Sequence, residues 1–279
     1  MDFRVRLLPL VALLGCAPDT FTGADAAPDA QPNDGGGGGD VAITDGPTGG
    51  DAIGVDGGPD LSCNNVLSGT VLCDDFDTPN ASGPAQKWSG QLAVNGNNSF
   101  DTSVFHSPPR SYRASIQAAD GGAFADSALL IQSLTTTSLA GVTLTTHAYA
   151  RIHAIDPNQA IGLLEVSYVP NTGATSRVWA AIIADNDKLN LVVQGDGTSV
   201  TATQQLTDVA LDTWVYLQID MIPSQSKVLA MVDTAQTAVS TPLADAAASP
   251  LPEVDLGLLN ASTDYASVAN YDNFLFRIH

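Results

Sequence analysis

The feature that most constrains this chain is a succession of short apolar runs between Cys63 and His279. The runs are rich in β-branched and aromatic residues and are separated by Gly, Pro, Asn and Asp. Such runs predict strands. No segment keeps the periodicity of an amphipathic helix, and Ala244–Ala248 is the only stretch that favours one. The predicted strands are Val71–Asp77, Gln91–Val94, Ser111–Ile116, Ala123–Ile131, Thr143–His153, Gly162–Val169, Arg177–Ala184, Lys188–Val193, Trp214–Ile222, Ser226–Val232, Val254–Leu259 and Tyr271–Ile278.

These strands predict an all-β fold in which two antiparallel sheets form a sandwich, because no helices alternate with them. The run that begins at Trp214 is followed by Lys227–Asp233, its expected hairpin partner. The segment starts with Cys73–Asp77 and ends with Tyr271–Phe276. This combination resembles the concanavalin A-like, or laminin-G-like, jelly roll of lectins and glucanases. The resemblance covers about residues 70 to 279, and it implies that the first and last strands are neighbours.

The N-terminus has the order of an export signal. Arg4 and Arg6 precede the apolar run Leu7–Leu14, which is too short to span a bilayer. The run ends at Gly15 and Cys16 and resembles the lipobox of bacterial lipoproteins. The resemblance implies that Cys16 carries lipid and becomes the mature N-terminus. The alternative is ordinary cleavage near Ala17, which would release a secreted protein.

The position after Cys16 is alanine and not the aspartate that resembles an inner-membrane retention signal. The lipobox resemblance therefore implies a membrane partner, reached through the lipid, and a location at the outer membrane or cell surface.

Residues 17–62 differ in composition from the rest. Their 46 residues include 12 Gly, 5 Pro and 9 Asp, and no Lys, Arg or Glu. Such a segment cannot bury enough apolar surface to offset its ordering entropy, so we expect a disordered tether. It resembles the spacers of myxobacterial surface lipoproteins. The chain thus divides into a signal peptide and lipobox (1–16), a tether (17–62) and a jelly-roll domain (63–279).

Composition excludes two classes of function. With 30 acidic and 10 basic residues the net charge is −20, which argues against nucleic acid as a partner. Glu165 and Glu253 are the only glutamates. The E-x-D-x-x-E strand of laminarinase-like members of the fold, whose two glutamates cleave the glycosidic bond, is therefore absent.

Polysaccharide lyases of the same fold use Arg, His and Tyr on the concave sheet. Their R-x-E-x-R strand is not matched, because Arg110–Ala114 contains no glutamate. The segment Thr143–His153 has suitable residues: alternation places His147, Tyr149, Arg151 and His153 on one face.

Glu165, Arg177 and Trp179 lie on later strands and could line one groove together with these residues. The candidate ligand-binding set is therefore His147, Tyr149, Arg151, Glu165, Arg177 and Trp179. The alternative is that these are the solvent-facing residues of an ordinary sheet, or, for Trp179, part of the core. No catalytic residue is assigned.

We predict a surface-tethered, non-catalytic domain that binds a polysaccharide or another extracellular ligand, because an aromatic and polar face can stack and hydrogen-bond sugar rings. The alternatives are a divergent polysaccharide lyase or glycoside hydrolase, and a structural or adhesive envelope lipoprotein.

The remaining cysteines, Cys63 and Cys73, are expected to form a disulfide in an oxidising compartment. A metal or nucleophilic thiol is the rival interpretation. Asp75, Asp77 and Asp272 are candidate ligands for a structural calcium ion where the terminal strands meet, as in jelly-roll carbohydrate-binding modules. Solvated acids, or an Asp272 that accepts backbone amide hydrogen bonds, would explain the same residues.

Overall fold

The computed structural model describes residues 63, 68–77, 83–118, 126–134, 138–157, 159–170, 177–195, 199–244, 251–259 and 265–279. All of them belong to one compact unit. Cys16 and the segment 17–62 lie outside the described residues. Among the described residues, no helix combines the length and the hydropathy that a membrane span requires.

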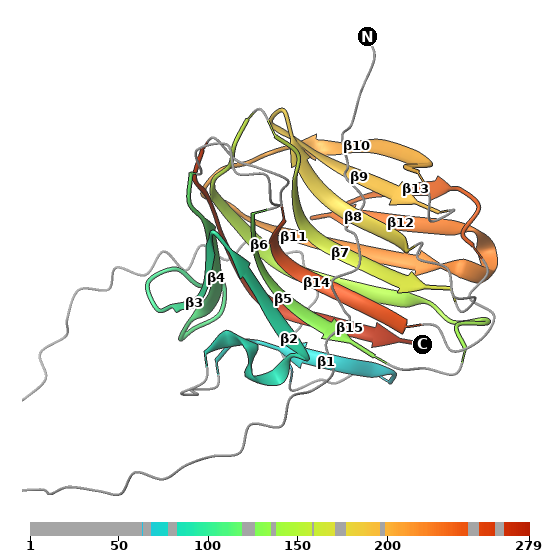
Figure 1. Ribbon diagram of the computed structural model, residues 1–279, viewed down its shortest axis with the longest axis horizontal. Coiled ribbons are helices and arrows are strands. Elements are labelled where there is room, and N and C mark those ends of the chain that lie inside the picture. The colour runs from blue at the N-terminus through green and yellow to red at the C-terminus, as the bar shows by residue number, and fades with distance from the viewer. Residues whose placement is uncertain are drawn as a thin grey trace, which may run out of the picture. The chain divides into compact units, whose positions relative to one another are not determined.

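The first sheet, called sheet 1, is antiparallel and has the order β13-β12-β11-β6-β15-β4-β3, with β1 also paired to β15 (Figure 1). Its strands are β1 (Thr70–Asp74), β3 (Gly96–Asp101), β4 (Ser111–Ile116), β6 (Leu144–Ala154), β11 (Trp214–Ile222), β12 (Lys227–Val232), β13 (Ala235–Ser240) and β15 (Ser267–Ile278). The expected neighbours β1 and β15, and the expected hairpin β11–β12, are both present.

The second sheet, sheet 2, is also antiparallel and has the order β10-β9-β8-β7-β14-β5-β2. Its strands are β2 (Gly90–Val94), β5 (Ser127–Ser133), β7 (Ile161–Val169), β8 (Val178–Asp185), β9 (Lys188–Gln194), β10 (Ala202–Asp208) and β14 (Leu251–Leu259). The described helices are two short 3₁₀ turns, η1 (Pro84–Lys87) and η2 (Pro223–Gln225). The predicted two-sheet sandwich is confirmed.

The core lies between the sheets because alternate residues of each strand point inward. On β6 the inward residues include Leu144, Ala148 and Ile152, all nearly inaccessible to solvent. Full burial of such a side chain contributes about 1.5–3 kcal/mol. The buried tyrosines also satisfy their hydroxyls: Tyr271 donates to the Gly257 carbonyl at 2.9 Å, and Tyr168 donates to the Ala244 carbonyl at 2.7 Å.

Three strands, β3, β10 and β13, were not predicted. Each lies at the edge of its sheet. An edge strand is less buried, so it does not need the apolar pattern that identifies interior strands. The sequences of β10 and β13 are accordingly polar and largely exposed.

The predicted disulfide between Cys63 and Cys73 is present, with Cα atoms 5.6 Å apart. Cys73 lies on β1, opposite Leu275 of β15. The bond thus ties the start of the domain to the strand that pairs with the chain's last strand.

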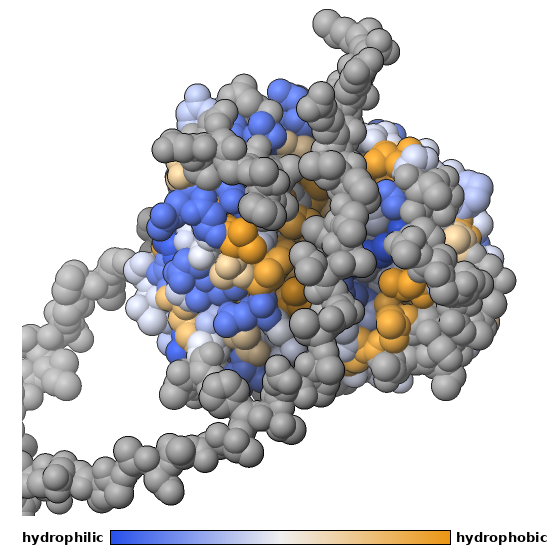
Figure 2. Space-filling model, in the orientation of Figure 1, coloured by the Kyte–Doolittle hydropathy of each residue, from blue (hydrophilic) through white to orange (hydrophobic). Residues whose placement is uncertain are grey.

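The two outer faces of the sandwich differ. Exposed apolar side chains on sheet 2 include Leu92 and Val94 of β2 and Leu251 of β14. Figure 2 shows hydrophobic residues gathered in the region of β2 and β5, with hydrophilic residues around them. The outer face of sheet 1 instead carries histidines, among them His147 and His153 of β6.

Candidate functional site

Alternate residues of β6 point away from the core and form the centre of the outer face of sheet 1. They are Thr145, His147, Tyr149, Arg151 and His153, so the predicted alternation of this segment is confirmed. Strand β11 lies beside it. Its register places Trp214 opposite Arg151, Tyr216 opposite Tyr149 and Gln218 opposite His147.

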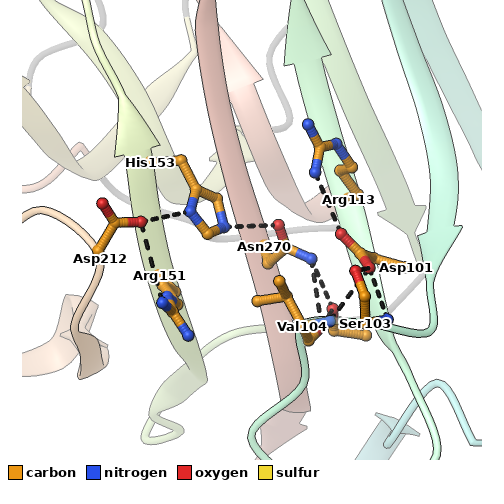
Figure 3. A network of polar contacts seen from close by, with 9 residues as sticks. Asp101, Ser103, Val104, Arg113, Arg151, His153, Asp212 and Asn270 are labelled. Atoms are coloured by element: carbon orange, nitrogen blue, oxygen red, sulfur yellow. Dashed lines mark hydrogen bonds and ion pairs between the residues drawn. The ribbon is translucent and has the colours of Figure 1, made fainter.

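His153 joins three elements on this face (Figure 3). Its Nδ1 lies 2.6 Å from the Asp212 carboxylate, and its Nε2 lies 3.0 Å from the Asn270 side-chain oxygen. Asp212 also approaches the Arg151 guanidinium at 3.9 Å. The backbone places Asp212 there, because its N–H donates to the carbonyl of Ile152 on β6 at 2.8 Å.

The network continues towards β4 and the segment after β3. Asn270 donates to the Ser111 hydroxyl at 2.8 Å. Arg113 donates to Asp101 at 3.1 Å, and Asp101 accepts from the backbone N–H groups of Ser103 and Val104. Burial alone would raise the pKa of Asp101, but hydrogen bonds from Ser103, Asn270 and Arg113 outweigh it and hold the pKa well below its usual value.

A second chain of hydrogen bonds crosses the face below Tyr149. Tyr216 donates to Gln218 at 2.6 Å, and Gln218 donates to Asp220 at 2.8 Å. The Tyr216 hydroxyl also lies 3.0 Å from His147 Nδ1. Because the hydroxyl proton points to Gln218, His147 Nδ1 carries a proton and donates it to the hydroxyl oxygen. Burial, with a smaller contribution from Arg277, lowers the pKa of His147 to about 3.

Among the described residues, three buried side-chain nitrogens of this face have no hydrogen-bond partner. They are His147 Nε2, which has a lone pair, and the Nε atoms of Arg151 and Arg277, which carry protons. Buried polar groups are nearly always paired in proteins. These three atoms are therefore candidates for contact with water or a ligand.

The segment between β3 and β4 covers part of the face. Its His106 ring is stacked on Tyr149, with centroids 3.8 Å apart, and meets Trp214 edge to face at 5.7 Å. Asp272 of β15 holds the segment: one carboxylate oxygen accepts from the N–H groups of His106 at 2.9 Å and Ser107 at 2.8 Å.

The hydrogen bonds of Asp272 bear on the predicted calcium site. The other Asp272 oxygen accepts from the N–H of Asn273 at 2.8 Å. The Ser107 hydroxyl, with its single proton, lies 3.2 Å from this oxygen and 3.0 Å from the Asn273 side-chain oxygen. Three backbone amides thus already bind the two carboxylate oxygens. Calcium binding through Asp272 therefore does not fit, and the alternative role as an acceptor of backbone amides does.

Asp75 and Asp77 lie just after β1, where Asp77 N–H donates to Asp75 at 3.3 Å. Burial, and then the charge of Asp75, raises the pKa of Asp77 to about 6. Within the described ranges, no three His, Cys, Asp or Glu side chains are grouped so that they could hold a metal ion.

The predicted ligand set is divided between the two sheets. His147, Tyr149 and Arg151 lie on β6 in sheet 1, whereas Glu165 lies on β7 and Trp179 on β8 in sheet 2. The expectation of one groove lined by all six residues is therefore wrong. The reason is that β6 and β7, although consecutive in the sequence, belong to opposite sheets.

On sheet 2, Arg177 is bound by acids. One guanidinium nitrogen lies 2.7 Å from Glu253, 3.1 Å from Asp255 and 3.2 Å from Glu165. Trp179 is half-buried opposite Ser167 and is not part of the core cluster. The guanidinium is thus already neutralised by acids of its own sheet.

Four residues of the sheet 1 face were not predicted as site residues: His106, Asp212, Trp214 and Asn270. The sequence predicted Trp214 only as the first residue of a strand. The other three come from a loop, a turn and the last strand, and no local sequence pattern joins them. The one available signal was the small number of histidines, four in an acidic chain. His279 also lies at this face, with its ring 3.1 Å from the Thr145 hydroxyl.

The contacts of the histidines limit which of their ring nitrogens a ligand can reach. Both ring nitrogens of His153 face oxygen acceptors, and Tyr216 and His147 are almost inaccessible. A general base needs a lone pair within reach of the substrate. The face does offer donors, acceptors and aromatic rings side by side.

No protein-family profile and no curated protein sequence matches the chain. Solved structures do. The endo-β-1,4-glucuronan lyase of the fungus Trichoderma reesei is similar with a TM-score of 0.59 and 13% identity, over 75% of this chain and 95% of that one. A family 7 alginate lyase, A1-II′, in complex with product has a TM-score of 0.51 and 11% identity, over 64% and 83%.

The cellulose induced protein Cip1 is similar with a TM-score of 0.51 and 12% identity, over 75% of this chain and 96% of that one. At such identities the likeness shows the fold. It confirms the concanavalin A-like jelly roll for the described domain.

Proposed function

We propose that the domain binds a glycan on the outer face of sheet 1 and does not cleave it. The observation that carries the proposal is the gathering of all four histidines and of Arg113, Arg151 and Arg277 on or beside one face of a chain with a net charge of −20. This face is where the chain concentrates the side chains that pair with hydroxyls and carboxylates.

Aromatic groups lie within the same face. Trp214 is partly exposed, and the His106–Tyr149 pair stands beside it. A sugar ring has an apolar C–H side that packs on aromatic rings, while its hydroxyls need both donors and acceptors. Arg151 donates, and Asp212 accepts.

The charges of this face nearly balance. Asp101, Asp212, Asp220 and Asp272 stand against the three arginines, and Asp101 is paired with Arg113 at 3.1 Å. Hydroxyl recognition therefore contributes more than net charge, and we expect binding to vary little with salt. The fold relatives named for glucuronan and alginate make these polyuronates natural probes beside neutral xylan and β-glucan.

Affinity electrophoresis through gels that contain each polysaccharide tests the proposal. The wild-type domain should be retarded in at least one gel. Arg151→Ala should lose the retardation, since it removes the guanidinium donor that lies opposite Trp214 on β6. Trp179→Ala, on sheet 2, is the matched control and should migrate as wild type. Retardation that survives Arg151→Ala and is lost in Trp179→Ala would refute the assignment. If the wild type is retarded in none of the gels, the alternative of a structural or adhesive envelope protein replaces glycan binding.

A second candidate is a polysaccharide lyase. The observation that favours it is the neutral His147, whose Nε2 lone pair is unused, bonded to Tyr216. Elimination next to a uronate carboxylate yields an unsaturated sugar that absorbs in the ultraviolet. Incubation with glucuronan and alginate should give no rise in this absorbance. A rise that His147→Gln abolishes would replace binding with catalysis.

We also propose that Cys16 is lipid-modified and anchors the protein to the outer membrane or cell surface, with secretion as the alternative. The ordered basic, apolar and Gly15-Cys16 segments support this. Cys16→Ser should move the protein from the membrane fraction to the soluble or unprocessed pool. Unchanged membrane association would contradict the anchor.

A further inference from the structure

We infer that His106 is a contact residue for the glycan: its imidazole is a fixed platform against which a pyranose ring packs, and its Nε2–H is a donor to that sugar. The inference rests on the proposed function and adds to it the residue at the centre of the site. No local sequence pattern identifies His106, which lies in the loop between β3 and β4.

The loop that carries His106 is held by hydrogen bonds on both sides of this residue. Ser103 and Val104 donate backbone N–H groups to Asp101 at 2.8 and 3.1 Å. Ser111 bonds the Val104 carbonyl. His106 and Ser107 then donate their N–H groups to Asp272. A loop that is already held in place loses little conformational entropy when a ligand binds. The segment is therefore a fixed part of the proposed site.

The strand that holds the loop is distorted at the point of contact. The register of β15 against β6 shifts between Asp272 and Leu275, and Asn273 has a left-handed backbone with φ of 49°. A bulge re-aims side chains, and here Asp272 and Asn273 both reach the loop. Local backbone strain in a central strand is expected where positioning matters.

These contacts fix the ring of His106. One side packs on Tyr149 at 3.8 Å with an interplanar angle of 12°, and Trp214 borders it edge-on. No described aromatic ring stacks on the other side, and the residue as a whole remains exposed. Asn273 Nδ2 lies 3.3 Å from Nδ1.

An amide N–H that faces Nδ1 makes this nitrogen an acceptor and leaves the proton on Nε2. Burial lowers the pKa of His106, which keeps the ring neutral at pH 7. Nε2 forms no hydrogen bond with the residues that the structure describes. A neutral aromatic ring with one unstacked side and one unused donor suits a pyranose, whose C–H side stacks and whose ring substituents accept.

The test uses the polysaccharide that retards the wild-type domain most strongly. His106→Ala should weaken its affinity by about tenfold, the combined effect of one stacking contact and one hydrogen bond. The melting temperature should stay within a degree or so, because the ring lies at the surface. Trp179→Ala, which removes an aromatic ring from sheet 2, is the control and should bind as wild type.

A second variant separates contact from general loop damage. Asn273→Ala keeps the imidazole but removes the amide that sets its tautomer. The ¹⁵N shifts of His106 should then report a change in the proton's position, and affinity should fall less than in His106→Ala. His106→Ala that binds as wild type, while Arg151→Ala does not bind, overturns the inference and leaves the proposed function standing. A wild-type domain that binds no polysaccharide overturns both.

Discussion

The buried side chain of His147 should make the stability of this domain sensitive to acid. Its side chain is 4% exposed, and its pKa of about 3 in the folded protein compares with an ordinary value of 6.5. A histidine whose pKa is lowered by folding contributes its full stability above pH 6.5, and that stability is lost as the pH falls towards 3, because only the unfolded chain takes up the proton. The loss is about 1.4 kcal/mol per pH unit, hence about 2 kcal/mol between pH 6.5 and about pH 5.

Urea unfolding of the wild type and His147→Gln at both pH values measures this loss. The variant should be less stable at neutral pH, since it breaks the bond to Tyr216. It should nevertheless lose about 2 kcal/mol less than the wild type on acidification. Tyr216→Phe is the control, because it breaks the same hydrogen bond but keeps the buried imidazole, and it should keep the wild-type pH dependence. Equal losses in His147→Gln and the wild type would refute the reasoning.

Other changes test the packing around the site. Asp272→Ala should cost about 2–4 kcal/mol in urea unfolding, because it leaves backbone amides without an acceptor. Asp185→Ala, at the half-buried last residue of β8, should change stability by about 0.5 kcal/mol or less, and equal effects would show that the bonds of Asp272 to the loop add nothing. Gly257→Ala should cost about 3 kcal/mol or more, since a Cβ there would lie 2.1 Å from the Ala128 carbonyl oxygen and 2.8 Å from the Tyr112 hydroxyl; a variant as stable as wild type would contradict this geometry. EDTA should leave the melting temperature unchanged, and a fall would restore a structural calcium ion.

The fold could be predicted because its information is local. The interior strands carry apolar runs that are visible without any partner, and turn residues separate them. Edge strands such as β10 lack this signal and were missed. The hairpin of β11 and β12 was predicted because its two strands are adjacent in the sequence.

The site could be predicted only in part, because alternation orders residues within a strand and not between strands. It placed His147, Tyr149 and Arg151 together correctly. It could not tell that the next strand crosses to the other sheet, which removes Glu165 and Trp179 from the set. The rest of the face is formed by residues far apart in the sequence, which the pairing of β6 with β11 and β15 brings together.

Asp272 shows a further limit. Its sequence surroundings fit a metal ligand, and its actual partners are backbone amides that lie 165 and 166 positions away. Such partners leave no trace in composition or spacing.

The most direct test of the central claim uses the three tryptophans of the chain as reporters. Trp214 lies on the outer face of sheet 1, Trp179 on sheet 2, and Trp88 is buried. Each indole N–H gives one signal in a ¹H–¹⁵N spectrum. During titration with the retarding polysaccharide, the Trp214 signal should shift while those of Trp179 and Trp88 stay in place. A shift of Trp179 with an unmoved Trp214 would contradict the account.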